Sequence, residues 1–98
     1  MMSQLSESQS QLLEIFSNKM REELAANGHK GDITSWSPSV YDLIAETAYH
    51  IAKLTKAMLE VERGGIETSR KEVDEFSADV ANFMAKTAQQ FGTITINK

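Results

Sequence analysis

The sequence predicts an all-α fold, in which an antiparallel hairpin of two long helices carries an additional N-terminal helix. Three segments have apolar residues at the three- and four-residue steps of a helix, and glycines separate these segments. The composition, with 41% hydrophobic and 24% charged residues, is typical of a globular chain. A length of 98 residues fits one small domain, spanning residues 1–98.

The first predicted helix covers about residues 6–26. Its apolar stripe has a residue at every fourth position, namely Leu12, Phe16, Met20 and Leu24. Asn27 and Gly28 follow the stripe and form a typical helix stop.

The second predicted helix covers about residues 38–63. Ser37 suits the N-cap and Pro38 suits the first helical position, where its missing N–H costs nothing. The paired glycines Gly64 and Gly65 end the helix. Its apolar stripe is Val40, Ile44, Thr47, Ile51, Leu54, Met58 and Val61.

The third predicted helix covers about residues 69–91, with Ser69 and Glu72 as a capping box and Gly92 as its stop. The short break before it favours an antiparallel hairpin with the second helix. The tail, residues 92–98, is expected to be flexible or to pair with a partner chain. Because so small a chain builds a thin core, we expect a homodimer or a tetrameric bundle.

Composition excludes several kinds of protein. The absence of cysteine excludes disulfides, thiolate nucleophiles and cysteine-bound zinc. A net charge of −4 makes a nucleic acid an unfavourable partner. Neither a membrane-spanning apolar run nor a signal peptide is visible, so we expect no membrane association and a cytoplasmic address.

Polar residues line one edge of each helix in the predicted hairpin. At about 100° per residue, these edges fall on the same side of the pair and face each other across a groove. Several carboxylates in one groove favour a cation, and oxygen ligands suit Mg²⁺ or Mn²⁺. The alternative is an ordinary solvated acidic surface. The residues are Glu46, His50 and Lys53 on one helix and Glu72, Glu75, Asp79 and Asn82 on the other.

The same region resembles the MazG-like superfamily of all-α nucleoside triphosphate pyrophosphohydrolases. The segment from Tyr49 to Ala57 aligns with the first acidic motif, Glu-Glu-x-x-Glu, and with the Leu-x-x-Ala after it. Ala78-Asp79-Val80 aligns with the end of the second motif, Glu-x-x-Asp. The segments 29–32 and 36–38 resemble those of short phage-type relatives, and the resemblance covers about residues 30–90.

The chain departs from both motifs. Tyr49, His50 and Lys53 occupy positions where acids are expected, Phe76 replaces the second motif's Glu, and Asp79 stays in register. The resemblance implies Mg²⁺ or Mn²⁺ on substitute acids, with His50 and Lys53 as catalytic groups and Lys53 and Asn82 as substrate-binding groups. The predicted metal ligands are Glu46, Glu72, Glu75 and Asp79.

Two classes of function therefore remain open. The first is a nucleotide-binding, Mg-dependent pyrophosphohydrolase with an altered site, which cleaves between the α- and β-phosphates. The second is a non-catalytic helical oligomer that sequesters a nucleotide or binds a protein partner, as a phage-type regulatory or inhibitory module. An enzyme needs Asp79 and two further acids converging on one ion, whereas a binding module needs only a pocket.

Overall fold

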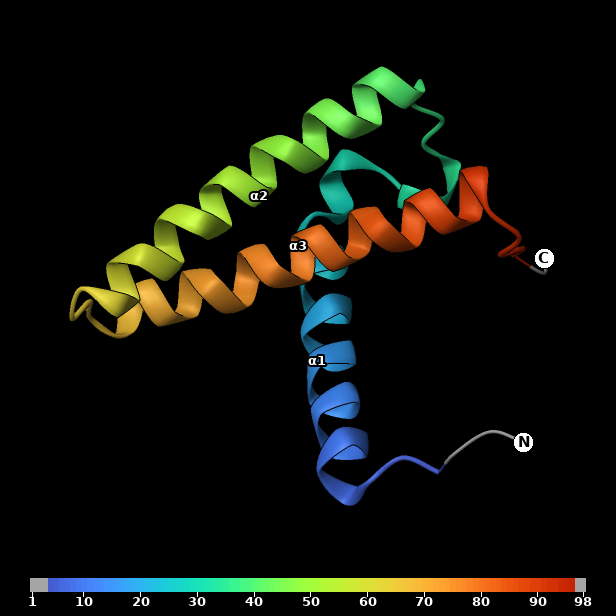
Figure 1. Ribbon diagram of the computed structural model, residues 1–98. Coiled ribbons are helices and arrows are strands. Elements are labelled where there is room, and N and C mark those ends of the chain that lie inside the picture. The colour runs from blue at the N-terminus through green and yellow to red at the C-terminus, as the bar shows by residue number, and fades with distance from the viewer. Residues whose placement is uncertain (1–3, 97–98) are drawn as a thin grey trace.

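The computed structural model describes residues 4–96 and is all-helical there, which confirms the predicted fold class. The fold has three long helices, α1 (Glu7–Ala26), α2 (Val40–Glu62) and α3 (Glu67–Phe91). Two short 3-10 turns, η1 (Gly28–Lys30) and η2 (Ile33–Ser35), lie in the connection between α1 and α2. In Figure 1, α2 and α3 form a long hairpin and α1 crosses α3 steeply. Within the described residues, no helix has the length and apolarity that crossing a membrane requires.

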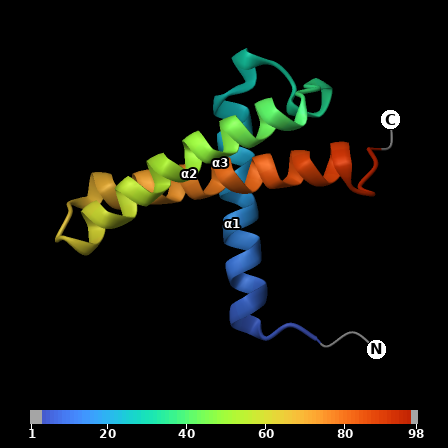
Figure 2. The same cartoon turned by 45° about the horizontal axis from the view of Figure 1, so that its top comes forward.

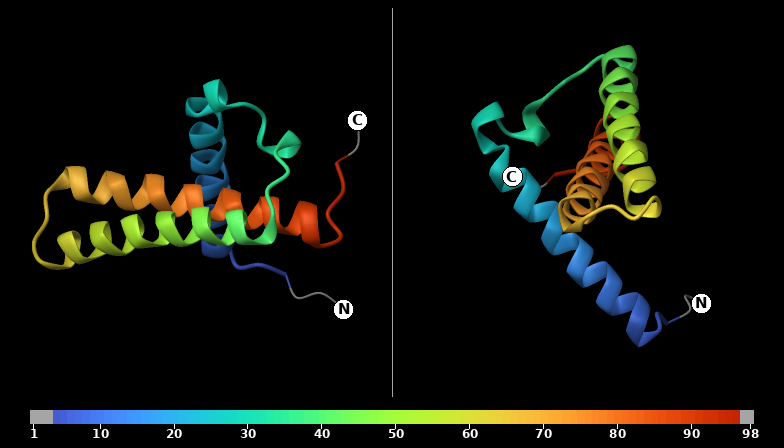
Figure 3. Two further views of the ribbon diagram at one scale, coloured as in Figure 1. Left: turned by 90° about the horizontal axis from the view of Figure 1, so that it is seen from above. Right: turned by 90° about the vertical axis from the view of Figure 1, so that its left-hand side faces the viewer.

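The hairpin has the predicted antiparallel arrangement. Figures 1 and 3 show α2 and α3 running in opposite directions from the turn that joins them, close together beside it and farther apart toward the other end. Gly64 has a φ of 86°, a left-handed conformation that glycine adopts without steric cost. A Cβ atom on Gly65 would collide with the Glu60 carbonyl, so both glycines are needed for this tight turn. Leu43, Thr47 and Ala57 of α2 are buried along the seam.

The N-terminal helix α1 begins with a capping box, in which Ser6 and Gln9 satisfy each other's backbone N–H groups. Its bounds agree with the predicted range. The amide of Asn82 on α3 donates to the Met20 carbonyl of α1 over 3.2 Å and ties the two helices together where they cross. Ala78, one turn earlier on α3, is 0% exposed, which lets the helices approach closely.

The connection between α1 and α2 is fastened to the C-terminal half of α3. The Lys86 ammonium, in a side chain only 4% exposed, donates to the Thr34 carbonyl over 3.3 Å. Gln89 donates to the same carbonyl over 3.2 Å. Gln90 donates to the Pro38 carbonyl over 2.6 Å. These bonds fix segment 33–38 beside the hairpin, where it forms one wall of a pocket.

Two predicted helix starts are wrong. The N-cap of α2 is Ser39, whose hydroxyl accepts from the Asp42 N–H, so Pro38 lies outside the helix. The helix α3 starts at Glu67 without a side-chain cap, and the Ser69 hydroxyl donates to Glu60 of α2 over 3.4 Å. At α2 a different serine provides the local cap, and at α3 the hydroxyl of the predicted cap residue bonds to another helix instead.

The tail is described only in part. Residues 92–96 adopt neither helix nor strand. The remaining residues of the predicted tail, 97 and 98, lie outside the described residues.

Candidate functional site

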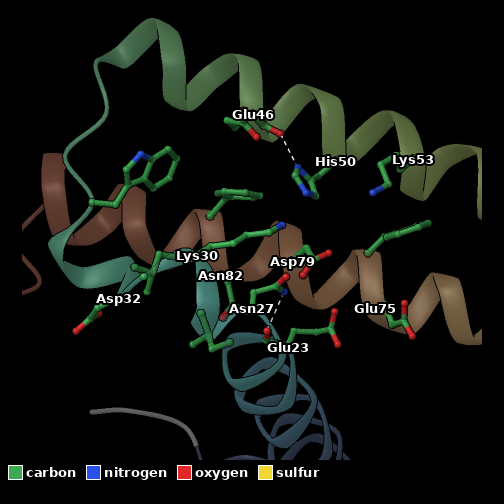
Figure 4. Close-up of a pocket in the computed structure, with 16 residues that line it drawn as sticks. Glu23, Asn27, Lys30, Asp32, Glu46, His50, Lys53, Glu75, Asp79 and Asn82 are labelled. Atoms are coloured by element: carbon green, nitrogen blue, oxygen red, sulfur yellow. Dashed lines mark hydrogen bonds between the residues drawn. The ribbon is translucent and has the colours of Figure 1, made fainter.

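A pocket of about 500 Å³ lies where α1, the η1–η2 connection and the hairpin meet. Figure 2 shows this junction, with the C-terminal end of α1 beside the middle of the hairpin. Figure 4 shows α2 on one side of the pocket, α3 behind it and α1 on the other side. This volume is within the range of small-molecule binding sites. All three helices contribute, so the pocket depends on the tertiary fold.

The α2 wall presents Glu46, His50 and Lys53, one helical turn apart (Figure 4). The Nδ1 atom of His50 lies 2.9 Å from the Glu46 carbonyl oxygen. Because a carbonyl can only accept, Nδ1 carries the proton and Nε2 is the imidazole's other hydrogen-bonding atom. Neutral His50 therefore offers an acceptor at Nε2, and protonated His50 offers a second donor.

Aromatic rings form the middle of the pocket. The Trp36 and Phe83 ring centroids are 6.0 Å apart in an edge-to-face arrangement. The His50 and Phe83 rings are 4.7 Å apart and tilted. These rings place flat apolar surface between charged groups, an arrangement suited to a planar aromatic ligand.

The Lys53 ammonium lies over aromatic rings at one end of the pocket. Its Nζ is 4.6 Å from the Phe76 ring centroid and 5.3 Å from the Tyr49 ring centroid. Both contacts are within the range of a cation–π interaction. The three residues occupy motif positions where the resemblance expects acids, and here they stabilise one another instead.

The opposite corner of the pocket is acidic. Glu23 of α1 lies beside Glu75 and Asp79 of α3. The pKa of Glu23 is raised above its ordinary value, first by burial and then by the negative charges of Asp79 and Glu75. A side-chain hydrogen bond to Asp79 acts in the same direction, while Lys19 lowers the pKa. Glu23 therefore holds its proton more readily than an isolated glutamate does.

Two amides and a second lysine complete the polar lining. Asn82 uses its Nδ2 on the Met20 carbonyl, and Asn27 uses its Nδ2 on the Glu23 carbonyl over 2.9 Å. Both amides are thereby oriented by α1. Lys30 extends from the η1 turn into the pocket toward Asp79 (Figure 4).

Most of the residues predicted for the site do line this pocket. Glu46, His50, Lys53, Glu75, Asp79 and Asn82 are among its walls, whereas Glu72 is not. In residues 4–96, no group of three or more histidine, aspartate or glutamate side chains is arranged to hold a metal ion. Of the four predicted metal ligands, Glu46, Glu75 and Asp79 line the pocket and Glu72 does not. Their role as ligands of Mg²⁺ or Mn²⁺ stays a prediction.

Sequence reasoning missed the contribution of α1 and the following connection. Glu23, Asn27, Lys30, Asp32 and Trp36 all line the pocket. Glu23 and Asn27 follow Met20 at three- and four-residue steps, so they continue the face that packs on α3. This continuation was the available signal, but the angle at which α1 crosses the hairpin cannot be read from periodicity.

Comparison of the chain with protein-family models, with curated proteins and with solved structures finds no match in any of the three.

Proposed function

We propose that the protein is a nucleotide-binding module that holds its ligand in this pocket without hydrolysing it. The observation that carries the proposal is the lining of the pocket, in which charged side chains surround aromatic rings. Lys30 and Lys53 line the pocket together with five acids, yet neither lysine forms an ion pair among residues 4–96. The ammonium groups are therefore free to bind an anionic group.

The ligand chemistry follows from these positions. The phosphates bind Lys53 and Lys30, with Nε2 of protonated His50 as a further donor. A planar base packs against Trp36 and Phe83. The carboxyl oxygens of Glu23 and Asp79 accept from sugar hydroxyl or base amino groups.

The α2 wall also supports binding rather than hydrolysis. A metal-activated water requires several acids around one ion. Lys53 instead places its positive charge over Phe76, at the end of the pocket where those acids are expected from the resemblance. We therefore assign Lys53 to phosphate binding and give it no catalytic role.

A Mg- or Mn-dependent pyrophosphohydrolase is the second candidate. The acids of the pocket favour it, because Glu46, Glu75 and Asp79 were predicted as ligands and Glu23 adds another carboxylate. A nucleotide that brings its own Mg²⁺ would offset their negative charge. Under this alternative, Asp79 is the residue whose loss abolishes turnover.

The experiment is calorimetric titration with a panel of nucleotides, with and without Mg²⁺ or Mn²⁺, followed by a pyrophosphate assay on the same samples. Binding without product supports the binding module. Pyrophosphate release that Asp79→Asn abolishes and Asp74→Asn retains establishes the enzyme, since Asp74 is exposed and lies outside the pocket. Absence of binding in every condition contradicts both candidates.

The remaining expectations belong to the same proposal. We propose that the module works in the cytoplasm as a homo-oligomer, and that it acts by sequestering its nucleotide. A protein partner is the alternative, in which the pocket face binds and inhibits another protein as a phage-type regulator does. A pull-down without nucleotide, comparing the wild type with the pocket variant Lys53→Glu, separates these two uses. A protein partner that binds the pocket face is captured by the wild type and lost by Lys53→Glu.

A further inference from the structure

The isolated chain has too little core for its size. Only three hydrophobic residues among those described are buried, namely Leu43, Ala57 and Ala78, and no large side chain is fully buried. The solvent-accessible surface is 7665 Å². A folded monomer of 10.9 kDa exposes about 5,600 Å². The chain therefore exposes roughly 2,000 Å² more than a compact monomer of its mass.

Part of this exposed surface is an apolar groove between α2 and α3, of about 570 Å³. It is lined by residues such as Ile44, Ile51, Met84 and Phe91, and Ile44 is 60% exposed. No residue of α1 or of the η1–η2 connection lines the groove. It therefore opens on the face of the hairpin that the charged pocket does not use.

The N-terminal half of α1 extends this exposed apolar surface. Leu12, Phe16 and Met20 follow one side of α1 at four-residue steps. Phe16 and Met20 are half-buried, whereas Leu12 is 67% exposed. Seen along the hairpin in Figure 3, this half of α1 projects past α3 on the side opposite the η1–η2 connection. The apolar side of α1 therefore extends beyond the part of the helix that packs on α3.

We propose that a second copy of this chain docks into the corner formed by the apolar groove and the projecting half of α1. In this dimer the hairpins pack groove to groove as a four-helix bundle. Each projecting half of α1, around Leu12, lies against the partner's hairpin. The face is self-complementary, as a two-fold interface requires.

The size of the exposed surface favours a second copy over a small peptide. Obligate homodimers bury about 2,000–5,000 Å² in total, or about 1,000–2,500 Å² for each partner. The excess of roughly 2,000 Å² for each chain lies within that range. A peptide ligand would leave one of the two surfaces, groove or α1, uncovered.

Cysteine protection tests the proposal, because the natural chain has no cysteine and a single introduced thiol is a clean reporter. The variants are Ile44→Cys in the groove, Leu12→Cys on α1 and Ile66→Cys as the matched control. Ile66 is 72% exposed in the turn before α3 and lies outside the groove. The readout is the rate of labelling by a bulky maleimide, with sedimentation velocity of the wild-type chain at several concentrations.

We expect a wild-type dimer, or a tetramer made of two such dimers, in which Ile44→Cys and Leu12→Cys react at least tenfold more slowly than Ile66→Cys. Dilution that dissociates the dimer should raise both protected rates together. A folded monomer, or three equal labelling rates in an oligomer, overturns the proposal. Protection of Ile44→Cys alone overturns the role of α1. These readouts do not involve the pocket, so they are independent of the proposed nucleotide binding.

Discussion

The two faces of the α2–α3 hairpin belong to the same two helices, yet they present opposite chemistry. The pocket face carries Lys53, Asp79 and their polar neighbours around aromatic rings. The other face carries Ile44, Ile51 and Phe91 with almost no polar group. A helix needs only one apolar side to fold against a single neighbour. This difference is the basis of the two proposals, a nucleotide at the first face and a second copy of the chain at the other.

The largest expected effect comes from shortening a side chain on the apolar face. Ile51→Ala should lower the free energy of unfolding by about 2 kcal/mol, because in the proposed dimer a second copy buries this side chain and its truncation leaves a cavity. Urea unfolding followed by circular dichroism measures this difference. The matched control, Ile66→Ala, should change stability by under about 0.5 kcal/mol. Equal effects at the two isoleucines would mean that Ile51 is as exposed in solution as it is in the isolated chain.

On the pocket face, removing the Lys53 charge should mainly affect the ligand. Lys53→Met should weaken nucleotide binding about tenfold, or ~1.4 kcal/mol, since a charge-assisted contact to phosphate is lost. Calorimetric titration provides the measurement. Lys56→Met is the control, because Lys56 is an exposed lysine of α2 outside the pocket. Unchanged affinity in Lys53→Met would contradict the binding of phosphate by Lys53 on the α2 wall.

A smaller effect should come from the bond that fastens the pocket wall to α3. Lys86→Met removes the ammonium that donates to the Thr34 carbonyl. Hydrogen exchange of the amides in segment 33–36 should become roughly fivefold faster, as expected for about 1 kcal/mol of lost local stability. Exposed Lys71 of α3 supplies the control variant Lys71→Met. Unaltered exchange in Lys86→Met would show that Gln89 alone holds the segment.

The smallest effect concerns the acidic corner and depends on pH. The pKa of Glu23 is raised in the folded protein, so the folded state holds this proton more tightly than the unfolded chain. The resulting stability is present below the ordinary value of 4.5 and is lost as the pH rises through the raised pKa. Glu23→Gln should therefore be more stable than wild type at pH 7 by roughly 0.5 kcal/mol, because solvent in the open pocket screens the repulsion.

The measurement for this variant is thermal unfolding at several pH values. The gain should disappear below pH 4.5, where the wild-type carboxyl is protonated. Glu14→Gln, at an exposed position of α1, should show no such dependence. A Glu23→Gln variant less stable than wild type at neutral pH would contradict the repulsion between Glu23 and Asp79.

Local signals were sufficient to predict the hairpin and part of the site. Apolar periodicity and the Gly64–Gly65 break located both helices, and the polar edges brought Lys53 and Asp79 to one groove. These features depend on helix geometry, which the sequence encodes directly. Two antiparallel helices have few ways to pack, so the facing edges could be paired without coordinates.

Tertiary contacts determine the features of the fold and of the site that the sequence did not predict. Ser37 and Ser39 both flank Pro38, and the structure shows that Ser39 caps α2 by accepting from the Asp42 N–H, while Gln90 donates to the Pro38 carbonyl outside the helix. Glu23 lies in the site because α1 crosses α3 near Ala78. The angle of this crossing depends on side-chain shapes, which the apolar periodicity does not describe. Glu72 fell outside the pocket, although its spacing matched that of Asp79.

The division between the two faces can be tested with the single tryptophan of the chain, Trp36, which lines the pocket and packs against Phe83. The measurement is a fluorescence titration of the wild-type protein with ATP in the presence of EDTA. We predict a saturable change in Trp36 emission that Lys53→Met shifts to about tenfold higher ATP concentration and Lys56→Met leaves in place. An emission that stays constant up to millimolar ATP would contradict nucleotide binding at this face.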